Sequence, residues 1–71
     1  MEEQKYKSGS LVRHILGEGL IVISALNKHG DNFDGKEHLA GYEMYRFSGN
    51  YLCKRSNFET VIVPQDELGT F

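Results

Sequence analysis

Short apolar runs alternate along the chain with polar turns that contain glycine, a pattern typical of β-sheet domains. The first two apolar runs cover residues 11–16 and 20–26, and the second is rich in β-branched residues. Gly17 and Gly19 lie between the runs and are expected to supply the positive φ angles of a tight turn. The pattern therefore predicts a hairpin of two strands at the start of the fold.

Three further strands are predicted in the second half of the chain, over residues 42–47, 51–55 and 58–63. Residues 48–50 and 56–57 are predicted to be the turns between these strands. Pro64 is expected to end the last strand, because proline lacks the N–H group that a strand ladder requires. Residues 65–68 suit a single helical turn.

Residues 27–41 form the longest stretch without strand character, and their Gly, Asp and Asn content predicts a long loop. Residues 1–8 are polar and are expected to form a flexible lead, which leaves 9–71 as a single domain. Five short strands with glycine turns and no full helix predict an all-β fold, a small five-stranded SH3-like (Tudor-like) barrel with one long loop at 27–41.

Size and composition favour a binding module over an enzyme. The chain has 71 residues, of which 39% are hydrophobic and 25% are charged. A domain of this length buries only about 60% of the surface that its unfolded chain exposes, so a roomy catalytic cavity would remove contacts that its core needs. The net charge is −2, whereas a non-specific DNA-binding protein is usually strongly basic. We therefore expect a non-enzymatic domain.

The single cysteine, Cys53, excludes an internal disulfide and a cysteine-based zinc site. Small extracellular domains usually carry several disulfides, so the sequence predicts a cytoplasmic protein. The polar residues 1–5 do not resemble a signal peptide, and no apolar run reaches membrane-spanning length. Cys53 is expected in the core, because neighbouring strand residues face opposite sides and Lys54 cannot activate the thiol.

The long loop holds five candidate metal ligands, His29, Asp31, Asp34, Glu37 and His38. A metal-dependent or enzymatic role centred on this loop is the weakest of three hypotheses. The spacing fits no zinc pattern, and Phe33 stands where an EF-hand needs an oxygen ligand. A solvated turn cluster is the favoured interpretation, and we expect no catalytic residue, no metal and no cofactor. His14 is expected to be packed and bonded locally.

Aromatic and basic residues are interleaved on the later strands. Proteins that bind single-stranded nucleic acid use such a mixture, and exposed Tyr and Arg also dominate protein interfaces. Strand alternation predicts Tyr45 and Phe47 inside, with Tyr42 and Arg46 outside. The alternative, that these aromatics fill a core without tryptophan, stays open. The candidate partner-binding residues are Tyr42, Arg46, Tyr51, Arg55 and Arg13.

The segment Gly9-x-x-Val12-x-His14, followed by Gly17-x-Gly19-x-Ile21-Val22, resembles the start of two known domain types. One is the Tudor-like SH3-fold domain at the carboxyl end of UvrD/PcrA-type helicases. The other is the RNA-polymerase-interacting domain of CarD-type transcription factors. The resemblance covers residues 9–23, where two residues separate His14 from Gly17, one fewer than in the helicase pattern. It implies an adaptor that engages RNA polymerase or other DNA-handling proteins, sometimes with weak nucleic-acid contact.

The sequence thus supports two leading hypotheses. The first is a non-enzymatic SH3-like adaptor, monomeric or dimeric, that binds a protein of the transcription or DNA-repair machinery, of the RNA polymerase or helicase class. The second is direct binding of single-stranded nucleic acid or RNA through the aromatic and basic strands. A bacterial or phage origin suits so small an adaptor, and no membrane association is expected.

Overall fold

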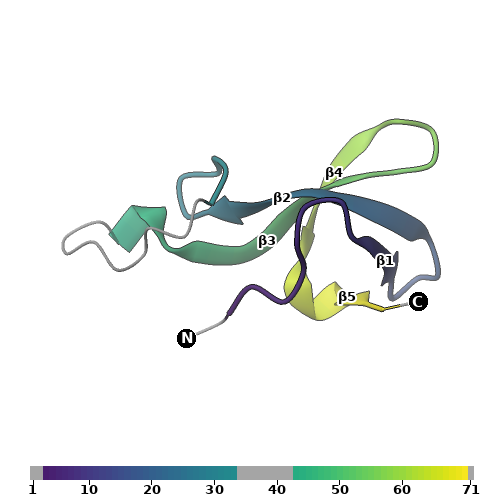
Figure 1. Cartoon of the computed structure of the whole chain (residues 1–71), viewed down its shortest axis with the longest axis horizontal. Coiled ribbons are helices and arrows are strands. Elements are labelled where there is room, and N and C mark those ends of the chain that lie inside the picture. The colour runs from purple at the N-terminus through teal and green to yellow at the C-terminus, as the bar shows by residue number, and fades with distance from the viewer. Residues whose placement is uncertain (1–2, 34–42, 71) are drawn as a thin grey trace.

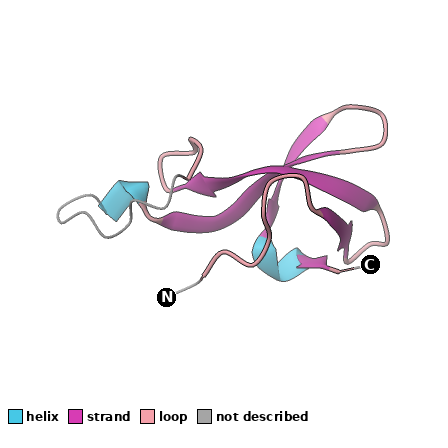
Figure 2. Cartoon of the chain, viewed as in Figure 1, coloured by secondary structure: helices cyan, strands magenta, loops and turns pink. Residues whose placement is uncertain are grey.

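The computed structural model describes residues 3–33 and 43–70, and within them the fold is all-β, as expected. Two single 3₁₀ turns, η1 (Glu43–Tyr45) and η2 (Gln65–Glu67), accompany the strands (Figure 1, Figure 2). No helix in these two ranges is long and apolar enough to cross a membrane. The strands of the single antiparallel sheet are β1 (Leu11–His14), β2 (Gly19–Asn27), β3 (Phe47–Lys54), β4 (Thr60–Pro64) and β5 (Leu68–Gly69).

The sheet is strongly curled. Its strands follow the order β4-β3-β2-β1-β5, so β4 and β5 are the two edges. The chain nevertheless passes from Pro64 at one edge to Leu68 at the other through η2 alone. Five flat strands spaced about 4.8 Å apart would separate the edges by about 19 Å. Four residues of 3₁₀ backbone span only about 8 Å. Within the described residues no strand pairing joins β4 to β5, and the sheet is open between them.

β1 and β2 form the hairpin expected at the start of the fold. The N–H of His14 donates to the carbonyl of Glu18 at 2.8 Å and closes the turn. Gly17 adopts a φ of +100°, the left-handed conformation that the turn needs. Gly19 is the first residue of β2 and has no positive φ. The expectation for Gly19 is therefore wrong, because a single left-handed residue is enough to reverse the chain here.

The strand expected over residues 42–47 begins later than predicted. Glu43–Tyr45 forms the 3₁₀ turn η1, so β3 starts only at Phe47, and Tyr42 lies outside the described residues. Strand alternation does not apply to a 3₁₀ turn. Phe47 is buried as expected, whereas Tyr45 is 41% exposed and the expectation of a buried Tyr45 is wrong.

β3 is also longer than expected, because the turn predicted at residues 48–50 lies inside it. Gly49 adopts a φ of +90° there, and the register between β2 and β3 shifts nearby, between Ala25 and Asn27. A left-handed glycine at a register shift is the mark of a β-bulge. The glycine signal thus indicates a bulge in a continuous strand and not a chain reversal.

The last third of the chain follows the expectation more closely. Residues 56–57 lie in the turn between β3 and β4, and β4 ends at Pro64. η2 supplies the helical turn predicted after this proline. β5 was not predicted, since two residues are too few to carry a pattern; it forms by pairing with Arg13 and His14 of β1.

Alternate strand residues face the inside of the curled sheet and make the core. Tyr6 and Phe33 pack against this core from outside the strands. Cys53 is fully buried, as expected, and burial raises the pKa of its thiol, which therefore stays protonated at neutral pH. The buried cluster consists of Val12, Leu20, Val22, Ala25, Phe47, Tyr51, Cys53, Val63 and Leu68.

Residues 3–8 run along the body of the domain. The side-chain amide of Gln65 donates to the carbonyl of Glu3 at 2.8 Å. The ring of Tyr6 meets that of Tyr51 edge to face at 5.6 Å, and its hydroxyl donates to the carbonyl of Leu68 at 3.1 Å. The flexibility expected for residues 1–8 stays a prediction, which these contacts make testable.

β2 and β3 continue past the other strands as a two-stranded arm (Figure 1). Phe33 packs on this arm, with its ring 5.6 Å from that of Phe47. The side-chain oxygen of buried Asn27 accepts the backbone N–H groups of His29 and Asp31 at 2.9 and 3.0 Å. The expected long loop therefore starts as an anchored turn, and its residues 34–41 lie outside the described part of the chain.

Candidate functional site

The five predicted partner-binding residues are scattered over the molecule. Tyr42 lies outside the described residues, Arg13 is exposed on β1, and Tyr51 is fully buried. Arg46 precedes β3 and Arg55 follows it. At 3.3 Å per residue, these two arginines are roughly 25–30 Å apart along the strand. The four described residues therefore do not form a single patch.

Tyr51 is a core residue, which corrects the expectation that it contributes to a binding surface. Its exposed fraction is 0%. It faces inward because it lies two residues from Cys53, on the same face of β3. Its hydroxyl accepts the N–H groups of Lys5 (3.0 Å) and Tyr6 (3.2 Å) and donates to the side-chain oxygen of Gln65. Tyr51 thus fastens the N-terminal segment to the core.

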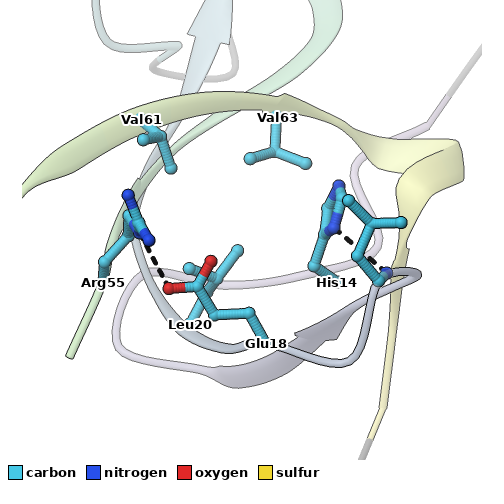
Figure 3. A pocket seen from close by; sticks show the side chains of 7 residues that line it. His14, Glu18, Leu20, Arg55, Val61 and Val63 are labelled. Atoms are coloured by element: carbon cyan, nitrogen blue, oxygen red, sulfur yellow. Dashed lines mark hydrogen bonds and ion pairs between the residues drawn. The ribbon is translucent and has the colours of Figure 1, made fainter.

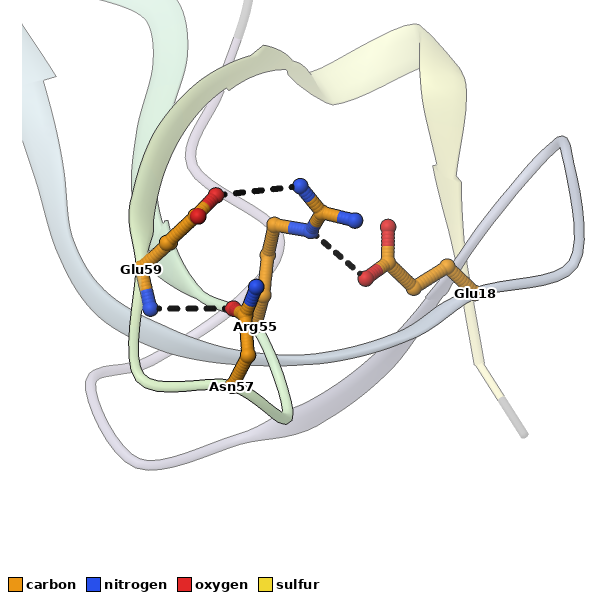
Figure 4. A network of polar contacts seen from close by, with 4 residues as sticks. All are labelled: Glu18, Arg55, Asn57 and Glu59. Carbon is orange, nitrogen blue, oxygen red and sulfur yellow. Dashed lines mark hydrogen bonds and ion pairs between the residues drawn. The ribbon is translucent and has the colours of Figure 1, made fainter.

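Arg55 is held between two glutamates (Figure 4). Its Nε donates to Glu18 at 2.8 Å, and its Nη1 donates to Glu59 at 3.2 Å. The hydrogen bond to Glu18, followed by the charge of that carboxylate, raises the pKa of the Arg55 guanidinium. Both carboxylates compete with any phosphate for this cation. Arg46 is likewise paired with Glu43, at 3.3 Å.

A cavity of about 300 Å³ opens between the β1–β2 turn and β4 (Figure 3). Leu20, Val61 and Val63 form its apolar wall, and Leu16 stands at its edge, while Glu18 and Arg55 bond to each other across it. No serine, threonine or cysteine is among the residues that line it. The cavity is therefore an apolar recess whose polar lining residues, His14, Glu18 and Arg55, already make hydrogen bonds within the protein.

His14 also lines this cavity, and its side chain is fixed by two contacts. Its Nε2 lies 2.8 Å from a carboxylate oxygen of Glu67, and its Nδ1 accepts the N–H of Leu16 at 3.2 Å (Figure 3). The expectation of a packed, locally bonded histidine is confirmed. His14 links β1 to η2 and shapes the rim of the cavity.

The most distinctive surface is the outer face of the sheet, opposite the core. Leu11 stands across from Ile21 on β1 and β2, and Leu52 stands across from Ile62 on β3 and β4. Leu11 is 65% exposed, Ile62 is 62% exposed, and Ile21 is 43% exposed. Clustered exposed aliphatic side chains mark interaction sites. We call Leu11, Ile21, Ile23, Leu52 and Ile62 the outer apolar face.

These residues are not among the predicted partner-binding residues, although the sequence carries a signal for them. Residues 20–23 and 61–63 are unbroken apolar runs. A strand with one wet face alternates apolar and polar residues, so an unbroken run indicates apolar side chains on both faces. In a single curled sheet, one of those faces has no second layer to cover it.

The charges on the outer face have one sign. Arg13 and Lys54 occupy outward-facing strand positions, next to Leu11 and in register with Ile21 respectively. Acidic side chains lie instead in turns and 3₁₀ segments of the described chain, such as the β1–β2 turn, η1 and η2. The outer face is therefore apolar and locally basic, although the whole chain carries a net charge of −2.

A second cavity, of about 250 Å³, adjoins the outer apolar face. Leu11, Leu20, Ile21 and Lys54 contribute to its lining. Phe58, in the loop between β3 and β4, is 77% exposed, and its ring centroid lies 5.0 Å from the ammonium nitrogen of Lys54. Lys54 thus lines the recess and also contacts an exposed aromatic ring that is not itself part of the lining.

Of the candidate metal ligands, His29 and Asp31 are described. The ring of His29 packs edge to face on that of Tyr45, at 5.2 Å. Asp34, Glu37 and His38 lie outside the described residues. In residues 3–33 and 43–70, no three His, Cys, Asp or Glu side chains are placed to hold a metal ion together.

The candidate site is accordingly defined by its geometry and chemistry. Comparisons with protein-family models, with curated proteins and with solved structures find no match.

Proposed function

We propose that this protein is a non-enzymatic adaptor that docks a protein of the transcription or DNA-repair machinery, of the RNA polymerase or helicase class, on its outer apolar face. One observation carries the proposal. The inner face of the sheet already provides the core, and yet the outer face presents a cross-strand cluster of exposed leucine and isoleucine. A partner that covers this cluster removes apolar surface from water, which drives association.

We also infer that the curled sheet is an SH3-like, Tudor-like barrel. Two features support this assignment. β5 pairs with β1, so the end of the chain returns to its start, as a closing barrel requires. η2 spans the remaining gap to β4 within three residues. The resemblance of residues 9–23 to helicase and CarD-type domains falls on the β1–β2 hairpin, and it is the basis for naming the partner class.

The size and charge of the outer face favour one kind of occupant, a short protein segment with apolar and acidic residues. Four strands about 4.8 Å apart, each contributing about five residues of 3.3 Å, make a face of about 15 × 16 Å. This area is well below the roughly 800 Å² per partner of a standard stable interface. The Lys54 ammonium complements acidic side chains.

Nucleic acid has one observation in its favour, the exposed Phe58 ring beside the Lys54 ammonium, and several against it. Tyr51 is buried, and Arg46 and Arg55 are paired with glutamates. The outer face offers mainly aliphatic side chains, whereas bases stack on aromatic rings. A catalytic role has little support, because the thiol of Cys53 is buried and the polar residues around the larger cavity are already bonded within the protein, Glu18 to Arg55 and His14 to Glu67.

A binding assay with purified proteins tests the proposal. The protein is immobilised, and bacterial RNA polymerase core enzyme or a UvrD-type helicase is passed over it in an interferometer. The Ile62→Glu variant places a carboxylate on the β4 side of the outer apolar face, at a position that is 62% exposed, so we expect the fold to be retained. Asp66→Asn, an exposed change on η2, is the matched control.

We expect one of the two proteins to bind the wild type and the Asp66→Asn variant equally. Ile62→Glu should weaken that binding at least about tenfold, or about 1.4 kcal/mol. Binding that survives Ile62→Glu unchanged contradicts the docking face. Failure of both proteins to bind contradicts the partner class, and binding of single-stranded DNA that weakens steeply with salt favours the nucleic-acid hypothesis instead.

A further inference from the structure

The loop between β3 and β4 breaks a local rule of hairpin chemistry. It consists of Ser56, Asn57 and Phe58, and it is closed by hydrogen bonds from Phe58 N–H to the Arg55 carbonyl (3.0 Å) and from Arg55 N–H to the Glu59 carbonyl (2.8 Å). Three-residue loops of this type end in a left-handed residue, which is normally glycine. Here the left-handed residue is Phe58, with a φ of +68°.

Within residues 3–33 and 43–70, core packing does not account for a phenylalanine at this position. A bulky residue with positive φ is strained, and such strain is usually offset by burial or by a functional role. The Phe58 side chain is 77% exposed, so core burial does not offset the strain. The loop is closed by backbone bonds and by the Asn57 side chain, which accepts the N–H of Glu59 at 3.1 Å. None of these bonds needs the Phe58 ring.

The Phe58 ring stands beside a cation that lines a recess. The Lys54 ammonium lies 5.0 Å from the ring centroid, within range of a cation–π contact. Within residues 3–33 and 43–70, Lys54 has no carboxylate partner, in contrast to its neighbour Arg55. Lys54 also lines the cavity of about 250 Å³ that Leu11 and Ile21 border.

We propose that Phe58, Lys54 and this cavity form the specificity element of the docking surface. The cavity receives one bulky apolar side chain of the partner segment, which packs against the exposed Phe58 ring. A carboxylate next to that side chain in the partner pairs with Lys54. This inference rests on the proposed adaptor function and names the chemistry of its partner, an apolar residue flanked by Asp or Glu.

A second copy of the chain is a poorer occupant. In a two-fold dimer, Phe58 of each copy could enter the cavity of the other copy, because the Phe58 ring and the cavity both adjoin Lys54. It would also bring together two outer faces that each carry Lys54, which has no carboxylate partner within residues 3–33 and 43–70. Like charges facing each other in an interface are unfavourable.

A peptide selection tests the inference. A library of random dodecapeptides displayed on phage is selected on the immobilised protein, and enriched peptides are synthesised and titrated by fluorescence anisotropy. The variants are Phe58→Gly, which suits the left-handed backbone, Lys54→Glu and Ile62→Glu, with Asp66→Asn as the control. Thermal melting of each variant shows that it is folded at the assay temperature.

We expect the enriched peptides to share a bulky apolar residue next to Asp or Glu. Phe58→Gly and Lys54→Glu should each weaken binding at least about tenfold, and Asp66→Asn should leave it unchanged. Replacing the peptide acid by Lys should restore binding to Lys54→Glu and abolish binding to the wild type. Such a reciprocal charge swap places the peptide carboxylate at Lys54.

The remaining outcomes separate this inference from the proposed function. Peptides that lose affinity for Ile62→Glu alone overturn the specificity element and leave the docking face standing. Peptides that none of the three outer-face variants affects overturn both. No enrichment over an unrelated domain overturns the inference, and the RNA polymerase and helicase assay then decides the proposed function. A Phe58-dependent dimer in sedimentation also overturns it, because the occupant is then a second copy.

Discussion

Removing the hydroxyl of Tyr51 is expected to destabilise the protein without affecting its binding surface. In Tyr51→Phe the ring stays in the core, so no large cavity forms. The N–H of Lys5 keeps a second acceptor, the side-chain oxygen of Gln65 at 2.9 Å. The N–H of Tyr6 loses its acceptor at 3.2 Å in a partly buried position.

The expected magnitude follows from that one unsatisfied donor and the lost bond to Gln65. Leaving a buried polar group without a partner costs about 1–3 kcal/mol. In a domain of 60–100 residues, each 1 kcal/mol lowers the melting temperature by about 4–8 °C. We therefore expect Tyr51→Phe to melt about 5–20 °C below the wild type. Tyr6→Phe removes a hydroxyl that makes one bond, to Leu68, and should have a smaller effect.

Far-UV circular dichroism gives the melting temperatures, and amide hydrogen exchange locates the change. The amide of Tyr6 should be protected in the wild type and should lose protection selectively in Tyr51→Phe. The reasoning would be refuted if Tyr51→Phe melted within 2 °C of the wild type and bound its partner more weakly. Those results would support a binding role for Tyr51. Unprotected amides throughout residues 3–8 of the wild type would support the flexible lead expected from the sequence.

Three other predictions concern stability. Phe58→Gly should change the free energy of unfolding by less than about 1 kcal/mol in urea denaturation. Glycine relieves the strain of a left-handed phenylalanine, and this gain offsets the greater entropy of the unfolded chain and the lost cation–π contact. A larger loss of stability indicates a structural role for the ring. Gly17→Ala should lower the free energy of unfolding by about 1–2 kcal/mol, because alanine is strained at a φ of +100°. The control Gly69→Ala should not lower it, because Gly69 has open space around it and no positive φ. Equal effects of the two substitutions would contradict the turn geometry. Because burial raises the pKa of Cys53 in the folded state, the unfolded thiol ionises first, so stability should fall as pH rises above about 9. Urea titrations of Cys53→Ala should lack this part of the alkaline decline, and identical profiles would contradict it.

The sequence predicts those parts of the fold whose signals are local. The apolar runs correctly predict β1, β2 and the second half of β3, and Pro64 correctly predicts the end of β4. The 3₁₀ turn η1 and the two-residue β5 escape prediction, because they depend on long-range packing and pairing. Gly49 is ambiguous for a physical reason: a left-handed glycine serves a turn and a bulge equally well, and only the partner strand distinguishes them.

The candidate site is less accessible from the sequence than the fold. Tyr and Arg were predicted to bind a partner because of their residue types. Tyr51, however, lies at an inward-facing strand position, and Arg55 forms ion pairs with Glu18 and Glu59. The predicted core position of Cys53 already implies that Tyr51, two residues away on the same strand, faces inward, and the selection by residue type did not take this parity into account. The outer apolar face was visible as unbroken apolar runs, but recognising it required knowing that a single sheet leaves one face uncovered. Phe58 is one of the interleaved aromatic residues, at the start of the predicted strand 58–63, but its left-handed backbone conformation leaves no signal in the sequence.

The central claim is that the outer apolar face is where a protein partner docks. Chemical-shift mapping tests it most directly: ¹⁵N- and methyl-labelled protein is titrated with the selected peptide, or with RNA polymerase or helicase if either binds. We predict that the largest shifts fall on Leu11, Ile21, Leu52 and Ile62 and extend to Phe58. Shifts concentrated instead around the larger cavity, at Leu16, Glu18 and Val61, or at η1, would contradict the account.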